Sequence, residues 1–97
     1  MTALAASTLL SRHPEAANSR VGDETVILHL VSGTYFGLDP VGTRIWELLE
    51  QPVTLATLTA RLLSEFDVSA EVLTRDVTDF LDQMLAHEIV QAGEGGG

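Results

Sequence analysis

Three aspartates near the C-terminus have a spacing that can bind a metal ion. Asp76, Asp79 and Asp82 form the pattern D-x-x-D-x-x-D, and helical enzymes hold magnesium with carboxylates three or four residues apart. The chain contains no lysine to bind a phosphate and no second acidic segment of this kind. A solvated acidic helix face is therefore the preferred interpretation, a face that contacts a partner is the main alternative, and a metal site in a small metal-dependent enzyme is the third.

The other residues with catalytic potential do not form a recognisable site. His13, His29 and His87 are far apart in sequence, and none belongs to an H-x-x-x-H pattern. The absence of cysteine excludes a disulfide, a thiolate zinc site and a cysteine nucleophile. No glycine-rich nucleotide-binding motif or serine-hydrolase motif occurs. The sequence therefore predicts a protein that is not an enzyme and that needs no metal or cofactor.

The charge balance limits the choice of partner. Fourteen acidic residues face five arginines, which gives a net charge of −9. This charge repels DNA, RNA and anionic membrane surfaces, because their binding proteins depend on basic side chains. No apolar run reaches the roughly 18 residues of a membrane span, and the N-terminus lacks the basic region of a signal peptide. We therefore predict a cytoplasmic protein with no nucleic-acid or membrane partner, for which a polypeptide remains an acceptable partner.

A β-hairpin is predicted to precede the helices. Residues 25–31 are β-branched and apolar, which predicts a strand, and Ser32-Gly33 is a two-residue turn that returns the chain along residues 34–38. Pairing Val31 with Thr34 places Leu30 opposite Tyr35. One face then carries Val26, Leu28, Leu30 and Tyr35, and the other carries Ile27, His29, Val31, Phe36 and Leu38. Because both faces are substantially apolar, we expect both to be covered.

Three helices are predicted from their caps and from apolar spacing. Asp39, Thr54 and Ser69 are suited to the N-cap position, and Pro40 stands where proline is tolerated in a first helical turn. On a helical wheel the third helix has an apolar stripe of Leu73, Val77, Phe80, Leu81 and Met84. Its flank consists of Val72, Asp76, Asp79, Gln83 and His87. The stripe is predicted to be buried, which leaves the flank free to contact a ligand.

These elements predict one α+β domain over residues 20–91. We expect residues 1–19 to form a flexible arm, with a first strand beginning near Arg20-Val21, and residues 92–97 to form a flexible glycine-rich tail. The tight connection between the second and third helices suggests a helix-turn-helix. A short closing strand at Ile89-Val90, together with the hairpin, would supply its wing.

The strand at residues 34–38 is the last of the predicted sheet, so one of its edges lacks a neighbour. It carries no lysine, proline or bulge signal, which are common ways of protecting such an edge. Two interpretations stay open. Either the edge accepts an extended peptide by strand addition, or Tyr35 and Phe36 simply complete the core.

The ordered set of motifs from about Gly22 to Val90 resembles the PqqD-like family, the recognition domains of ribosomally made and post-translationally modified peptides. The motifs are GDETVILHLVSGTYFGLD, VGTRIWELL, the helix start at Thr54 to Leu58, and EFDVSAEVLTRDVTDFLDQMLAHEIV. The resemblance implies a small winged helix-turn-helix in which an antiparallel three-stranded sheet precedes three helices.

The resemblance also implies a function. Members of the family bind the leader region of a precursor peptide as an antiparallel strand on the third strand of the sheet, in a groove against the third helix, and present it to a maturation enzyme. Matching positions imply a peptide site at Thr34, Tyr35, Phe36, Gly37, Val72, Asp76, Asp79, Phe80 and Gln83. The acidic flank would suit basic or hydrogen-bonding leader side chains.

Three readings of the role follow, and they differ in partner. A stand-alone chain of this kind resembles the recognition proteins of lasso-peptide pathways, which work with a leader peptidase. The first alternative is a PqqD-type carrier of the precursor in pyrroloquinoline quinone synthesis. A winged-helix transcriptional regulator is an alternative from another class, but it requires a basic recognition helix, and the third helix contains only Arg75. We expect a monomer or a weak dimer, since an open strand edge can also pair with itself.

Overall fold

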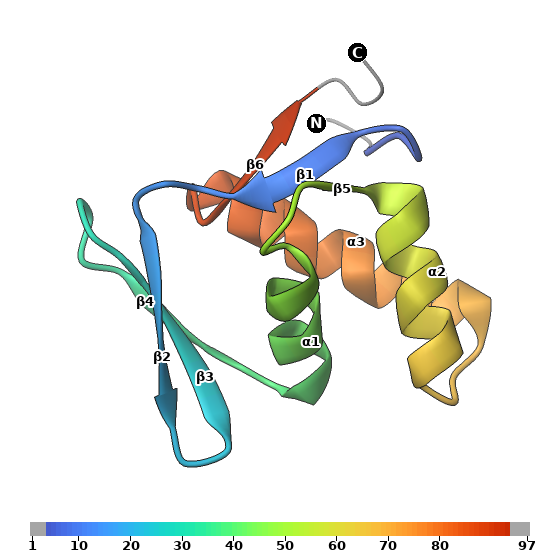
Figure 1. Cartoon of the computed structure of the whole chain (residues 1–97), viewed down its shortest axis with the longest axis horizontal. Coiled ribbons are helices and arrows are strands. Elements are labelled where there is room, and N and C mark those ends of the chain that lie inside the picture. Colours follow the sequence, from blue (N-terminus) through green and yellow to red (C-terminus); the bar gives the residue numbers. More distant parts are fainter. Residues whose placement is uncertain (1–3, 94–97) are drawn as a thin grey trace.

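The computed structural model describes residues 4–93 and contains two three-stranded antiparallel sheets and three helices (Figure 1). The elements in chain order are β1 (Leu9–Arg12), β2 (Ala16–Val21), β3 (Glu24–His29), β4 (Tyr35–Leu38), α1 (Pro40–Leu48), β5 (Val53–Thr54), α2 (Leu55–Glu65), α3 (Ala70–Ala86) and β6 (Val90–Gly93). The β2–β3–β4 sheet lies beside α1, and β1 and β6 cross the top of the helices in this view. The predicted α+β class, with a three-stranded sheet followed by three helices, is confirmed.

The β3–β4 hairpin pairs two residues away from the predicted register. Leu28 faces Tyr35 and Ile27 faces Phe36, so the loop is longer than the predicted two-residue turn. The His29 ring explains the difference, because its Nδ1 accepts hydrogen bonds from the backbone N–H groups of Val31 (3.3 Å) and Ser32 (3.1 Å). A slip of two residues keeps every strand side chain on its predicted face, whereas a slip of one would have exchanged the faces.

The two faces of this sheet differ in burial. Thr25, Ile27 and His29 point towards the helices and are buried. On the other face Leu28 is 39% exposed and Tyr35 is 72% exposed. The expectation that both faces are covered is therefore wrong for the part of the chain that the structure describes. No described element packs on the second face.

A second sheet, of order β5–β1–β6, contains a segment that the sequence analysis assigned to a flexible arm. Residues 9–12 form β1, which pairs with both neighbours, and β2 begins at Ala16 rather than near Arg20. Leu10 explains why this segment is ordered, since its side chain is fully buried in the core. The closing strand expected at Ile89-Val90 is β6, and it pairs with β1 instead of extending the hairpin as a wing. Of the tail expected at residues 92–97, Ala92 and Gly93 belong to β6 and pair with β1, whereas residues 94–97 lie outside the described residues.

The three predicted N-caps are confirmed. Asp39 accepts a hydrogen bond from the N–H of Gly42 at 2.7 Å, Thr54 from Thr57 at 3.2 Å, and Ser69 from Val72 at 3.2 Å. Each bond satisfies one of the N–H groups that a helix start leaves without an internal partner. The three caps thus determine the residues at which α1, α2 and α3 begin.

One hydrophobic core lies between the helices and the two sheets. It contains side chains from all three helices and from both sheets, among them Leu10, Ile27, Ile45, Leu62 and Val77. The predicted stripe of α3 is buried at four of its five positions; the exception, Phe80, is half-buried. Within residues 4–93, no helix combines the length and the apolar character that crossing a membrane requires.

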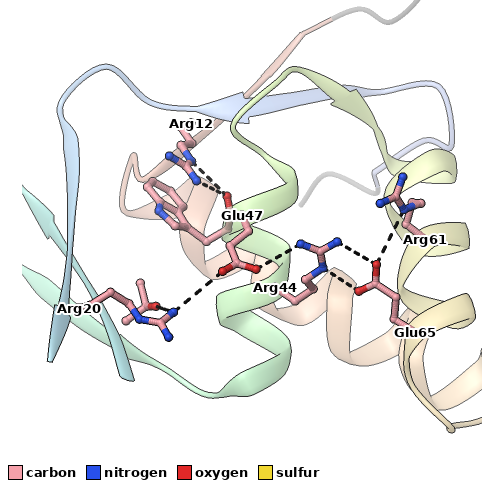
Figure 2. A network of polar contacts seen from close by, with 8 residues as sticks. Arg12, Arg20, Arg44, Glu47, Arg61 and Glu65 are labelled. Carbon is pink, nitrogen blue, oxygen red and sulfur yellow. Dashed lines mark hydrogen bonds and ion pairs between the residues drawn. The ribbon is translucent and has the colours of Figure 1, made fainter. Parts of the chain in front are cut away.

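Ion pairs connect the elements around α1 on the molecular surface (Figure 2). Arg44 on α1 forms two hydrogen bonds with Glu65 on α2, from Nε to Oε1 at 2.7 Å and from Nη2 to Oε2 at 2.9 Å. Glu47 lies between Arg44 at 3.2 Å and Arg20 of β2 at 4.0 Å, and Arg61 lies 3.9 Å from Glu65. This set of residues, which we call the arginine network, ties α1 to α2 and to the first sheet.

Arg12 fastens β1 to the end of α1. Its Nε and Nη2 donate to the backbone carbonyl of Trp46 at 3.1 and 2.7 Å, which satisfies an acceptor in the last turn of the helix. The guanidinium group also lies 4.3 Å from the centre of the Trp46 ring, a cation–π geometry. Burial lowers the pKa of Arg12, an effect partly opposed by the nearby carboxylates of Glu50 and Glu47.

The Arg44–Glu65 pair predicts a dependence of stability on pH. The hydrogen bonds from Arg44 hold the pKa of Glu65 below its ordinary value of 4.5. A lowered folded-state pKa stabilises the protein above the unfolded-state pKa, and this contribution disappears as the pH falls through the folded-state pKa. We therefore expect Glu65→Gln to reduce the free energy of unfolding at pH 7 and to have a progressively smaller effect below about pH 4.5.

Urea unfolding of both proteins between pH 7 and pH 3 would measure this difference. Asp82→Asn serves as the control, because Asp82 is exposed on α3 and forms no ion pair or side-chain hydrogen bond within residues 4–93. If the Glu65→Gln difference stayed constant over the whole pH range, the pair would not be stabilising the fold through its charge.

Candidate functional site

The outer edge of β4 has no neighbouring strand among the described residues. The sheet order β2–β3–β4 places β4 at an edge, paired with β3 alone. The N–H of His29 donates to the carbonyl of Thr34 at 2.8 Å, and in an antiparallel ladder alternate residues bond to the neighbour. Phe36 and Leu38 therefore direct their backbone groups at β3. Tyr35 and Gly37 direct theirs outwards, where a further strand can bind.

Two adjoining hollows lie next to this edge, and we call them together the groove. The smaller, of about 210 Å³, is lined by Phe36, Gly37, Leu38, Asp39, Phe80, Gln83 and Met84. The larger, of about 450 Å³, is lined by Asp39, by Val41, Gly42 and Ile45 of α1, by Phe66 and Val68, and by Val72, Leu73, Asp76, Asp79, Phe80 and Gln83 of α3. Asp39, Phe80 and Gln83 line both hollows, so they form one continuous depression beside β4.

The groove has an apolar floor and acidic walls. Phe36 lies in its floor with its ring 5.0 Å from that of His87, measured between centroids, and Phe80 lines both hollows. Three carboxylates, of Asp39, Asp76 and Asp79, line the groove, and no basic residue does. Such a surface favours an extended ligand that combines apolar side chains with positive charge.

Most of the arginines lie away from these carboxylates; the exception is Arg75, which precedes Asp76 on α3. Four of the five arginines belong to the arginine network or to the Arg12 contact with Trp46 (Figure 2). The network lies on the face of α1 formed by Thr43, Arg44 and Glu47, whereas the groove is lined by Val41 and Ile45. The helix α1 thus separates the side of the molecule that carries the paired arginines from the acidic groove.

Seven of the nine residues predicted for the site line the groove: Phe36, Gly37, Val72, Asp76, Asp79, Phe80 and Gln83. Thr34 and Tyr35 do not. Thr34 closes the β3–β4 loop with its carbonyl. Tyr35 points to the opposite, exposed face of the sheet because it pairs with Leu28. Only the backbone of Tyr35 is directed towards the free edge.

Several groove residues were absent from the predicted set, chiefly Gly42, Phe66 and Val68. Gly42 offered a signal, since a glycine within a helix costs about 1 kcal/mol relative to alanine and so indicates close packing. Here a Cβ atom would lie 3.1 Å from both the Phe80 ring and Asp39 Oδ1. Phe66 and Val68 are apolar residues in the short connection between α2 and α3; Phe66 also packs against the edge of the core, whereas Val68 is exposed.

We expect Gly42→Ala to destabilise the protein by about 1 kcal/mol. The added methyl group crowds the Phe80 ring and the capping carboxylate of Asp39, and overpacking costs about 1–3 kcal/mol, which outweighs the gain of about 1 kcal/mol in helix propensity. Urea unfolding measures the change. Gly37→Ala is the control, since its Cβ would meet no atom within 4 Å. A more stable Gly42→Ala protein would show that the contact with Phe80 relaxes freely.

The described residues contain no cluster of three His, Asp or Glu side chains placed to hold a metal ion. Asp76 and Asp79 line the groove, whereas Asp82 does not. The spacing D-x-x-D-x-x-D therefore does not bring three carboxylates to one point. The site offers main-chain hydrogen-bonding groups, apolar hollows and negative charge.

Comparisons with known proteins agree with this description. A family model described as coenzyme PQQ synthesis protein D (PqqD) matches residues 24–90. The structure of TbiB1 in complex with the TbiA(beta) leader peptide is 36% identical to this chain, with a TM-score of 0.76, and the match covers 84% of this chain and 94% of that chain. No curated protein matches.

A second structure shares the fold at lower identity. It is a lasso peptide synthetase B1 complexed with the leader peptide, with a TM-score of 0.74 and 21% identity over 84% of this chain and 96% of that chain. The family match spans most of the described domain, from β3 to the start of β6. The chain belongs to the PqqD family, and its fold is that of a PqqD-like recognition element.

Proposed function

We propose that this chain is a non-catalytic protein that binds the leader region of a ribosomal precursor peptide in a lasso-peptide pathway. It presents the bound precursor to a maturation enzyme, which we take to be a leader peptidase, and acts in the cytoplasm as a monomer or weak dimer. The observation that carries the proposal is the free β4 edge beside the groove. The 36% identity to TbiB1, whose structure contains a leader peptide, supports it.

The peptide binds by strand addition to β4. The outward N–H and C=O groups of Tyr35 and Gly37 form the main-chain hydrogen bonds, which supply affinity for any sequence. Side chains alternate between the two faces of a strand, so every second peptide residue enters the groove. The hollows around Phe36 and Phe80 then select among leader sequences.

Antiparallel addition sets the direction of the peptide. The strand β4 runs from Tyr35 to Leu38 and leads into α1 at Asp39. The N-terminal part of an antiparallel peptide therefore lies beside Leu38 and enters the larger hollow. Its C-terminal part passes Tyr35 and leaves the protein at the β3–β4 loop.

The walls of the larger hollow define the chemistry of the leader. An apolar side chain packs on Phe80 and Val72, and a basic or hydrogen-bonding side chain reaches the carboxylates of Asp76 and Asp79. These carboxylates lie three residues apart on one helix, so they face the same side of α3. We therefore expect leaders that combine apolar residues with at least one positive charge.

Titration of labelled leader peptides, followed by fluorescence anisotropy, tests the proposal. The probes are the TbiA(beta) leader peptide and the leader of a short precursor encoded beside this chain. We expect micromolar or tighter binding of the cognate leader, and at least a tenfold loss, about 1.4 kcal/mol, for Phe36→Ala and for Asp76→Arg. Phe36→Ala removes the floor of the smaller hollow, and Asp76→Arg reverses a charge in the larger one.

Asp82→Arg is the matched control for the charge reversal, since Asp82 is exposed on the same helix outside the groove. It should weaken leader binding much less than Asp76→Arg does, because the Asp82 side chain does not line the groove and is surrounded by solvent. Folded Phe36→Ala and Asp76→Arg proteins with unchanged affinity would mean that the peptide binds elsewhere.

The family description favours one second candidate, a PqqD-type carrier of the precursor in pyrroloquinoline quinone synthesis. This role uses the same edge and differs in the precursor and the partner enzyme. The reading frames beside this chain distinguish the two roles, since a lasso pathway requires a peptidase and a cyclase.

A DNA-binding role is disfavoured by the charge of α3. This helix carries the acidic residues Asp76, Asp79 and Asp82 and contains Arg75 as its single basic residue, whereas DNA-binding helices need basic side chains to contact phosphates.

A further inference from the structure

The exposed face of the β2–β3–β4 sheet is almost free of charge in a protein with a net charge of −9. The register places Ala17 beside Leu28 and Tyr35, Ser19 beside Val26 and Gly37, and Val21 beside Glu24. We call these eight positions the outer face. Glu24, at the far end of the β2–β3 hairpin, is its only ionisable residue apart from the tyrosine.

The β3–β4 loop extends the outer face with two further apolar residues. Leu30 is 58% exposed and Val31 is 75% exposed. Their backbone is held in place, because the N–H of Leu30 donates to the carbonyl of Glu15 at 2.8 Å and that of Val31 to His29 Nδ1 at 3.3 Å. Contiguous apolar surface of this kind on a small protein usually marks an interaction site.

The outer face and the groove share β4, and this connects the face to the bound peptide. Phe36 faces the groove, while Tyr35 faces outwards next to Leu28. A peptide added to the free edge of β4 widens the sheet by one strand, and its alternate side chains lie beside Tyr35. The same peptide leaves the protein at the loop that carries Leu30 and Val31.

We propose that the outer face, together with Leu30 and Val31, docks the maturation enzyme that acts on the bound peptide. This inference rests on the proposed function, since the direction of the peptide follows from antiparallel addition to β4. An enzyme seated on this surface receives the peptide where it emerges from the protein. The contact surface of the enzyme is mainly apolar, because the docking surface is mainly apolar and its two carboxylates, of Glu24 and Glu15, lie at its opposite ends.

The double variant Leu30→Asp/Val31→Asp tests the inference. Both residues are exposed loop residues outside the strands, so the substitution leaves the core and the groove intact. The matched control is Leu63→Asp, an equally apolar residue that is 36% exposed on α2. The measurements are leader affinity by fluorescence anisotropy, affinity for the leader peptidase encoded beside this chain, and the rate at which that peptidase cleaves the full precursor.

We expect the double variant to bind the leader within twofold of the unmodified protein, to bind the peptidase at least tenfold more weakly, and to support at least tenfold slower cleavage. Leu63→Asp should change none of the three. Unchanged peptidase affinity and cleavage with normal leader binding would overturn the docking surface and leave the proposed function intact. Failure of the unmodified protein to bind either leader would overturn both.

A second copy of this chain is the competing occupant of the outer face. Sedimentation velocity of the unmodified protein and the double variant distinguishes it. A dimer that the two aspartates convert to a monomer, with cleavage unchanged, would assign the surface to self-association and overturn the proposal.

Discussion

Replacing Gly37 with proline is expected to weaken leader binding at least tenfold while the domain stays folded. Gly37 directs its N–H away from β3, towards the free edge. Proline removes this donor and places its ring where the incoming strand would lie. The leader then keeps an unpaired carbonyl at the interface, and such an unpaired group costs about 1–3 kcal/mol. The β3–β4 ladder loses no bond, because its hydrogen bonds are made by Phe36 and Leu38.

Gly37→Ala is the control for this substitution. It retains the N–H group, and its Cβ would meet no atom within 4 Å, so it should bind the leader almost as tightly as the unmodified protein. Anisotropy titrations measure both affinities, and urea unfolding verifies that both variants are folded. Equal affinities for a folded Gly37→Pro and Gly37→Ala protein would rule out strand addition to β4, even if the leader still occupied the groove.

Phe80→Ala is expected to have the largest effect among the groove side chains. The Phe80 ring lines both hollows and contacts the first turn of α1 at Gly42. Its truncation enlarges both hollows and removes the surface on which the peptide side chains pack. We expect a loss of leader affinity of about 30-fold, or about 2 kcal/mol, the size associated with a central contact residue.

The same substitution also lowers stability, because Phe80 packs against the core from one side. The cost should stay below the roughly 3–5 kcal/mol of a fully buried phenylalanine, since Phe80 is only half-buried. Leu85→Ala separates the two effects, because Leu85 is a half-buried core neighbour on α3 that does not line the groove. An equal loss of leader affinity in Leu85→Ala would show that general destabilisation, and not the groove, explains the result.

The elements that the sequence predicted best are those with a local cause. The N-caps at Asp39, Thr54 and Ser69 depend on a side chain and an N–H three residues later, so a single sequence is sufficient to find them. The stripe and flank of α3 follow from helical periodicity in the same way. The residues that α3 contributes to the groove, both the apolar ones and the acidic ones such as Asp76, can therefore be predicted without knowledge of tertiary contacts.

The features that the sequence did not predict depend on contacts between residues far apart in the chain. The strand β1 has only four residues, and it is ordered by pairing with β5 and β6 more than forty positions away. The hairpin register depends on the His29 ring accepting two backbone N–H groups, which the turn signal of Ser32-Gly33 does not reveal. The contribution of Phe66 to the larger hollow likewise requires α2 and α3 to be placed against α1.

The peptide site has a negative potential, because three carboxylates line the groove without a basic residue, whereas the arginines beyond α1 are paired with Glu47 and Glu65. A basic leader approaching by diffusion is attracted to this negatively charged site before it makes contact, which accelerates association. The molecule is 32 Å across its longest axis, whereas mobile ions screen charge over about 8 Å at physiological ionic strength. The steering therefore acts only during the final approach, and added salt slows the capture of the peptide more than it hastens its release.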